Sequence, residues 1–263
     1  SEMASTITIR PPHLANSIPA DIEVKGFEIK GGIGNKMDKD ITTPSGSQII
    51  TERLGGGIMI YNTSPKIDGN SINNNGGLGT SAGGGIMSIS SDEDWDFNNR
   101  DYEINCEPAN DSLYFSNNTI ENNNSNIANS IYIEGSEGHD GVDLTNSTFD
   151  IYSTANQGVS QFWIDSNAPV FYTNVSGNYE PIIQDIVYID PDEGQDIYSD
   201  VSGDIDHPFK SIGYALKWVY PTTSNPMTIS LSPGTYNSPN ENFPLNIISD
   251  LTLNSDYHDL ETW

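Results

Sequence analysis

The chain has 263 residues, of which 35% are hydrophobic, and it carries 37 acidic against 10 basic side chains, for a formal net charge of −27. Such a charge argues against nucleic acid as a partner, because phosphates require a surface rich in lysine and arginine. It equally disfavours anionic membranes, and no apolar run is long enough to predict a membrane-spanning helix. The single cysteine excludes a disulfide framework within the chain.

The first predicted elements are strands with period-two alternation of apolar residues, at 6–9 and 22–29. Residues 33–52 are polar and read as an irregular excursion. The segment 55–61, Gly-Gly-Gly-Ile-Met-Ile-Tyr, follows, and it returns as Gly-Gly-Gly-Ile-Met-Ser-Ile at 83–89. A segment that recurs at a fixed spacing, here about 28 residues, is typical of repeat architectures.

Two short strand patterns recur along the first two thirds of the chain. One has apolar residues at both ends and Asn or Gly between them, at 24–29, 67–72, 115–120 and 144–149, with a looser copy at 171–175. The partner strand recurs at 58–60, 86–88, 131–133 and 162–164. The apolar ends are expected to point inward, while Asn or Gly takes a positive φ in the bend. The Asn runs at 73–75 and 122–124 suit stacked amide ladders.

These repeats predict an all-β fold, a right-handed single-stranded parallel β-helix of about five or more coils over residues 6–176. Loop insertions are expected near 33–52 and 91–111. The character of the sequence changes after residue 176, where a strand at 187–190 precedes an acidic loop. Helical spacing of apolar residues behind a proline then predicts one short α-helix near 208–219, and further strands follow at 227–231, 243–247 and 251–253.

This second region carries a recognisable order of motifs. Pro-Phe-Lys-Ser-Ile begins at 208, Ile-Ser-Leu-Ser-Pro-Gly-Thr-Tyr at 229 and Phe-Pro-Leu-Asn-Ile at 243. The order resembles the opening of right-handed parallel β-helices of the pectin-lyase-like class, a group of uncharacterised secreted or surface proteins. The resemblance implies an N-terminal cap, a secreted or cell-surface location and no assigned reaction.

In that class the cap precedes the coils, whereas here it follows them. Residues 186–260 are therefore predicted to be the cap strand, cap helix and opening coils of a second or permuted β-helix unit. The segment is expected to cap either its own chain or a neighbouring copy, which would give head-to-tail self-association.

A catalytic role would require paired carboxylates, or a base beside a bound cation. The repeat aligns Glu121 with Asp150 on neighbouring coils, at a separation that suits a retaining glycosidase. These two residues are the catalytic candidates. The alternative interpretation is a pair of outward carboxylates on an acidic surface.

Calcium is the one cofactor that the sequence suggests, although none is required by the fold. Asp92, Asp94 and Asp96 alternate in an acidic segment, and Glu103 falls at the twelfth position, a spacing that suits Ca²⁺. Phe97 stands where an EF-hand loop needs glycine, so the segment also reads as a solvated acidic loop. The region 135–143 resembles a single calcium-binding nonapeptide, and the aspartates of the loop at 192–206 suit loop capping better than ligation.

Carbohydrate binding is the remaining expectation. Tyr61, Tyr132 and Trp163 recur on or beside the partner strand and would form a ladder for sugar rings if they face outward, or part of the core if they face inward. The leading hypothesis is a non-catalytic extracellular β-helix repeat, structural or adhesive, that binds polysaccharide or a cell-surface glycan. The alternative is a polysaccharide lyase or glycoside hydrolase of the β-helix class.

Overall fold

The structure is a computed structural model. It describes residues 5–10, 22–43, 46–77, 80–89, 112–125, 128–134, 141–151, 162–164, 170–171, 173–179, 182–199, 201–219, 221–237, 241, 245, 247 and 250–255. The chain forms two compact units, Ser1–Tyr179 and Glu180–Trp263, which we call the coil unit and the second unit. Each unit is described by itself.

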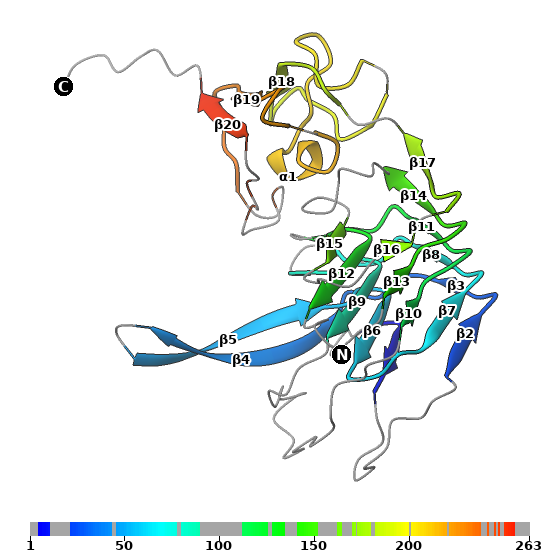
Figure 1. Cartoon of the computed structure of the whole chain (residues 1–263). Helices are drawn as coiled ribbons and strands as arrows, with labels where there is room; N and C mark the ends of the chain where they lie inside the picture. The colour runs from blue at the N-terminus through cyan, green and yellow to red at the C-terminus, as the bar shows by residue number, and fades with distance from the viewer. Residues whose placement is uncertain are drawn as a thin grey trace. The chain divides into compact units, whose positions relative to one another are not determined.

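The coil unit contains three parallel sheets of five strands each, stacked as the successive turns of a solenoid (Figure 1). Sheet A consists of β1 (Ile7–Ile9), β6 (Ile58–Tyr61), β9 (Ile86–Ile89), β12 (Ile131–Glu134) and β15 (Phe162–Ile164). Sheet B consists of β2 (Glu23–Lys25), β7 (Lys66–Asp68), β10 (Leu113–Tyr114), β13 (Val142–Asp143) and β16 (Val170–Phe171). Sheet C consists of β3 (Glu28–Ile29), β8 (Ser71–Asn73), β11 (Thr119–Glu121), β14 (Thr148–Ile151) and β17 (Ser176–Tyr179).

Each coil contributes one strand to each sheet, in the order A, B, C, and all strand pairs within the three sheets are parallel. The predicted all-β parallel β-helix is therefore confirmed. Its interior is a continuous apolar column whose members are stacked from coil to coil. In sheet C, for example, Ile29, Ile72, Ile120 and Phe149 are successive pairing partners, and all four are buried.

The bend between sheets B and C shows why the six-residue pattern repeats. One residue at the same position of each coil has a positive φ: Gly26, Gly69, Asn117, Asn146 and Asn174. Only glycine adopts this conformation without cost, and asparagine tolerates it better than most residues. The expected inward apolar ends and the positive φ of the bend are both found.

The last coil departs from the predicted alignment. Asp143 pairs with Phe171, so Phe171 does not continue the inward row of Phe115 and Leu144, and its side chain is 53% exposed. Phe149 pairs with Gly177, so this coil lacks the apolar residue that marks the end of the pattern in the other coils. The looser copy predicted at 171–175 therefore does not begin with an inward apolar residue in the structure.

The excursion predicted over 33–52 is a regular antiparallel hairpin and is not irregular. Its strands are β4 (Asn35–Thr43) and β5 (Gly46–Leu54). At its base, Met37 and Leu54 pack with the outward side chains of Met59, Met87 and Tyr61, all of them buried. The hairpin base therefore helps to cover part of the outer face of sheet A.

The two Gly-Gly-Gly segments form the corner that leads into sheet A. A Cβ on Gly57 would lie 2.6 Å from the carbonyl oxygen of Gly85 and 2.8 Å from Nδ2 of Asn75. A Cβ on Gly56 would lie 2.3 Å from the carbonyl oxygen of Gly84. The glycines are needed because coils meet backbone to backbone at this corner and leave no space for a side chain.

The second unit contains a parallel sheet in the order β18 (Ile186–Ile189), β19 (Met227–Leu231) and β20 (Leu251–Ser255), with helix α1 (Ile212–Ala215) between the first two strands. Ser211 is the N-cap of α1, and its hydroxyl accepts from the N–H of Tyr214. The predicted short helix is present, and Phe209, Ile212 and Ala215 are buried as its spacing predicted.

The carboxylate of Glu241 accepts hydrogen bonds from the N–H groups of Ile212 and Gly213 at 2.7 and 2.9 Å, at the start of α1. Glu241 is buried, and the resulting desolvation raises the pKa of its carboxyl group despite these two bonds. Among the described residues, no helix has the length and apolar character required to cross a membrane.

Candidate functional site

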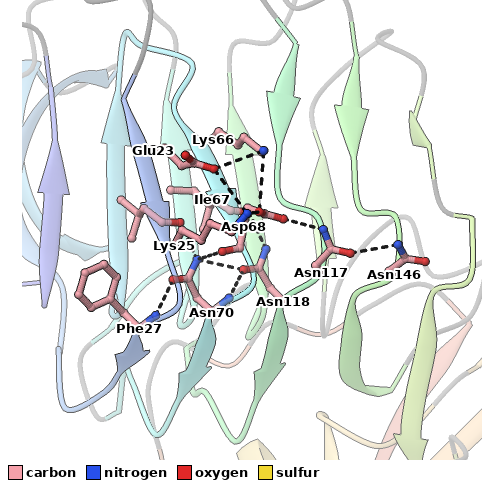
Figure 2. Close-up of polar contacts among 11 residues, drawn as sticks. Glu23, Lys25, Phe27, Lys66, Ile67, Asp68, Asn70, Asn117, Asn118 and Asn146 are labelled. Carbon is pink, nitrogen blue, oxygen red and sulfur yellow. Dashed lines mark hydrogen bonds and ion pairs between the residues drawn. The ribbon is translucent and has the colours of Figure 1, made fainter.

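The outer face of sheet B carries the most organised polar arrangement in the described part of the chain. Its first two coils hold four alternating charges, which Figure 2 shows as one network. Nζ of Lys25 contacts the carboxylate of Asp68, and Nζ of Lys66 lies 3.3 Å from Oε1 of Glu23 and 3.8 Å from Oδ2 of Asp68. The strand register places these residues together, because Glu23 pairs with Lys66 and Lys25 pairs with Asp68.

Asp68 is the centre of this network and is only 4% exposed. The hydrogen bond from Lys25, followed by that from Asn117, holds the pKa of the Asp68 carboxyl below its ordinary value of 3.8, against the effect of desolvation. The same contact raises the pKa of Lys25 above 10.5. Both shifts favour the ion pair, so Asp68 is a fixed anion at neutral pH.

A ladder of exposed amides starts from this anion and runs along the bend. Nδ2 of Asn117 donates to Oδ1 of Asp68 at 2.6 Å, and Nδ2 of Asn146 donates to Oδ1 of Asn117 at 3.0 Å. Asn174 then donates to Asn146 at 3.1 Å. Every amide points its donor toward Asp68, since a carboxylate can only accept at the end of the chain. Figure 2 shows the first two of these bonds, from Asn117 to Asp68 and from Asn146 to Asn117. We call Asn117, Asn146 and Asn174 the outer ladder.

A second set of ladders is buried. Oδ1 of Asn118 accepts from the backbone N–H of Asn70 at 2.9 Å, and Nδ2 of Asn118 donates to the carbonyl of Ile67 at 2.8 Å. Ser147 continues the row: its hydroxyl accepts from the N–H of Asn118 and donates to the carbonyl of Phe115. Asn75 and Asn123 form an equivalent pair at the end of sheet C. The ladders predicted from the runs 73–75 and 122–124 therefore exist, with Asn75 and Asn123 as their members.

Sequence reasoning missed an aromatic row beside the outer ladder. The pairing of sheet B places Lys66, Tyr114, Asp143 and Phe171 at one position of successive coils. Tyr114 is 44% and Phe171 53% exposed, so both rings face solvent. A signal exists in the sequence, because Tyr114 directly precedes a repeat, whereas the match with Phe171 follows only from the pairing of β13 with β16.

The predicted catalytic pair is engaged in two different structural contacts. Glu121 and Asp150 follow Ile120 and Phe149, which are pairing partners, so they do lie at the same position of adjacent coils. Asp150 is buried, and its Oδ2 accepts from the backbone N–H of Asn122 at 2.7 Å. Glu121 accepts from Nδ2 of Asn178 at 2.5 Å. A shared catalytic role for the two carboxylates stays a prediction.

The three aromatic residues expected to bind carbohydrate do not form one row. Tyr132 pairs with Met87 and with Trp163, whereas Tyr61 pairs with Ile89, two positions further along the strand. Tyr61 is 1% exposed because it packs in the cluster covered by the hairpin base. The structure therefore corrects the placement of Tyr61, while carbohydrate binding by Tyr132 and Trp163 stays untested.

The predicted calcium ligands, Asp92, Asp94, Asp96 and Glu103, lie outside the described residues, as does most of the segment 135–143. Within the described ranges, no group of three or more potential ligand side chains is found that could hold a metal ion. In the acidic loop of the second unit, Asp196 accepts from the N–H groups of Lys210 and Ser211, and Asp204 from those of Asp206 and His207. Asp204 caps a turn of the loop, as the sequence suggested, whereas Asp196 joins the loop to the segment just before α1.

The model of a family described as a protein of unknown function (DUF1565) matches residues 193–259, which lie within the second unit. The family is associated with β-helix proteins, in agreement with the parallel coils seen here, and the match covers well under half of the chain. No curated protein and no solved structure matches the sequence.

Proposed function

We propose that the chain is a non-catalytic β-helix repeat protein with a structural or adhesive role at a cell surface or in secreted material. The proposal rests on the structural contacts that the carboxylates make. Asp150 and Asp196 accept from backbone N–H groups, Glu121 accepts from the amide of Asn178 two coils further along sheet C, and Asp68 anchors the outer ladder. The acidic groups are arranged to hold coils and loops, which is the chemistry of a scaffold.

The competing function is that of a polysaccharide lyase or glycoside hydrolase. Such an enzyme needs two carboxylates on either side of a sugar, or a base beside a bound cation. The alignment of Glu121 with Asp150 is the observation that favours it. The full chain should be incubated with acidic and with neutral polysaccharides, in the presence of Ca²⁺, and assayed for unsaturated products and new reducing ends. Turnover that disappears in Glu121→Gln and Asp150→Asn would overturn the scaffold proposal.

Calcium binding belongs to the same proposal as a stabilising interaction of the segment that contains Asp92, Asp94, Asp96 and Glu103. The alternating carboxylates support it. Added Ca²⁺ is expected to raise the melting temperature of the full chain, and Asp94→Ala to remove the response. An identical response in the variant, or none in the parent chain, rejects this part.

Self-association of copies is supported by the edges of the sheets. In the described part of the chain, β20 pairs through one edge with β19, and β1 pairs through one edge with β6. Both are parallel edge strands, and open edges are templates for pairing with another chain. We propose that β20 of one copy pairs with the first coil of the next. Light scattering should show a mass that rises with concentration and falls in Leu253→Pro, whereas a monomer at every concentration would reject the pairing.

A further inference from the structure

We propose that the outer face of sheet B, along coils three to five, is a binding track for a neutral β-1,4-linked polysaccharide. The track consists of the aromatic residues Tyr114 and Phe171 and the outer ladder. This inference rests on the non-catalytic function proposed above and adds to it the binding face and the class of ligand.

The aromatic rings supply the apolar part of the track. Tyr114 and Phe171 occupy the same row and are separated by one coil, that of Asp143. Two coil steps of about 4.8 Å place the rings about 10 Å apart. This is close to the repeat of a β-1,4-linked disaccharide, so alternate sugars of one chain can stack on the two rings. Both side chains are exposed, so an extended polymer that lies across the strands of sheet B can contact both rings.

The outer ladder supplies the polar part. An asparagine amide has two N–H donors and two acceptor lone pairs, and the ladder uses one donor and one lone pair of Asn146. A second N–H and a second lone pair lie outside the ladder on this exposed side chain. Since Asp68 fixes the direction of all three amides, their outward groups repeat in one orientation at each coil. Sugar hydroxyls both donate and accept, and can therefore bind such a row.

The polar residues in and beside the aromatic row leave the rings of Tyr114 and Phe171 accessible. Oδ1 of Asp143 accepts from the N–H of Thr145 at 2.9 Å, which holds this carboxylate against its own backbone. Thr145 and Thr173 stand between the aromatic row and the outer ladder, and both are short side chains. The occupant is expected to be neutral, because a chain with a net charge of −27 repels polyanions.

The test is calorimetric titration of the full chain with cellohexaose and chitohexaose, with product analysis of the same samples. We expect binding without cleavage. Tyr114→Ala and Phe171→Ala are each expected to lower the affinity about tenfold, and Asn146→Gly should also lower it while retaining the positive φ that this position needs. Phe27→Ala is the matched control, because Phe27 is 59% exposed but lies outside the aromatic row, and its affinity should equal that of the parent chain.

Failure of this inference can be distinguished from failure of the proposed function. Absence of binding to both oligosaccharides, or equal losses in Phe27→Ala and Phe171→Ala, overturns the track and leaves the scaffold intact. Binding accompanied by cleavage overturns the scaffold and leaves the track. Binding that survives loss of both rings in the double variant shows that another face is used.

Discussion

The buried ladder allows the clearest quantitative prediction, which is the effect of replacing Asn118. This residue is 1% exposed, and its side chain accepts from the N–H of Asn70 and donates to the carbonyl of Ile67. Asn118→Ala removes these partners from two buried backbone groups. Each such group costs about 1–3 kcal/mol, so the free energy of unfolding should fall by about 2–6 kcal/mol.

The chain itself provides the matched rescue. At the next position of this ladder, the hydroxyl of Ser147 accepts a backbone N–H and donates to a backbone carbonyl. Asn118→Ser can make the same two bonds and should lose less than the alanine variant. Asn146→Gly is the control for an exposed amide and is expected to change stability by less than about 1 kcal/mol.

Urea unfolding followed by circular dichroism measures all three variants against the parent chain. If Asn118→Ala and Asn146→Gly lose the same free energy, the buried ladder contributes no more than an exposed one, and the reasoning from buried backbone partners is wrong. An alanine variant that is as stable as the serine variant would refute it as well.

Three further predictions concern charge and packing. The pKa of the Asp68 carboxyl is lower in the folded chain than its unfolded value of 3.8, so its contribution to stability is fully present above pH 3.8 and is lost as the pH falls through the folded pKa. The stability of Asp68→Asn should therefore depend less on pH in the acid range, and a pH profile equal to that of the parent chain would contradict the argument. Gly57→Ala should strongly destabilise the coil unit, because there is no space for the added Cβ. Gly213→Ala in α1 should be tolerated, because the nearest atom to the added Cβ is Oε2 of Glu241 at 3.3 Å. Equal melting temperatures for the two variants would contradict the packing argument. Glu241→Ala removes the partner of two N–H groups, of which only that of Ile212 is fully buried, and should cost the second unit about 1–3 kcal/mol. The loss should appear as faster amide hydrogen exchange in 212–219, and unchanged exchange would show that the cap is dispensable.

The repeat could be predicted from sequence because every coil solves the same local problem. A residue with positive φ must follow an inward apolar residue, and Gly26, Gly69 and Asn117 meet this requirement at equivalent positions. A solenoid stacks such units on their neighbours alone, so the pattern in one coil carries over to the next. The pattern fails in the last coil, where the exposed Phe171 stands at its start and Gly177 replaces the apolar residue at its end.

The candidate site was harder to predict because it depends on contacts between coils. Lys25 and Asp68 are distant in sequence and meet only through the pairing of β2 with β7. The burial of Tyr61 has a similar origin, since alternation along β6 correctly gives an outward side chain but does not reveal that the hairpin base covers it. Period-two alternation identifies the direction of a side chain, and what lies above it is a matter of tertiary packing.

The register of sheet B also explains how an acidic chain can leave a face open for a neutral ligand. In coils one and two, Lys25 and Lys66 neutralise Asp68 and Glu23, and these side chains are occupied with one another. From coil three onward the row that contains Glu23 and Lys66 continues as Tyr114, Asp143 and Phe171. The outer ladder runs along all of these coils, because its amides take their direction from the ion-paired carboxylate and each donates to the residue one coil nearer to it. The ion pairs of coils one and two thus fix the direction of the amides in coils three to five, where we propose that the ligand binds.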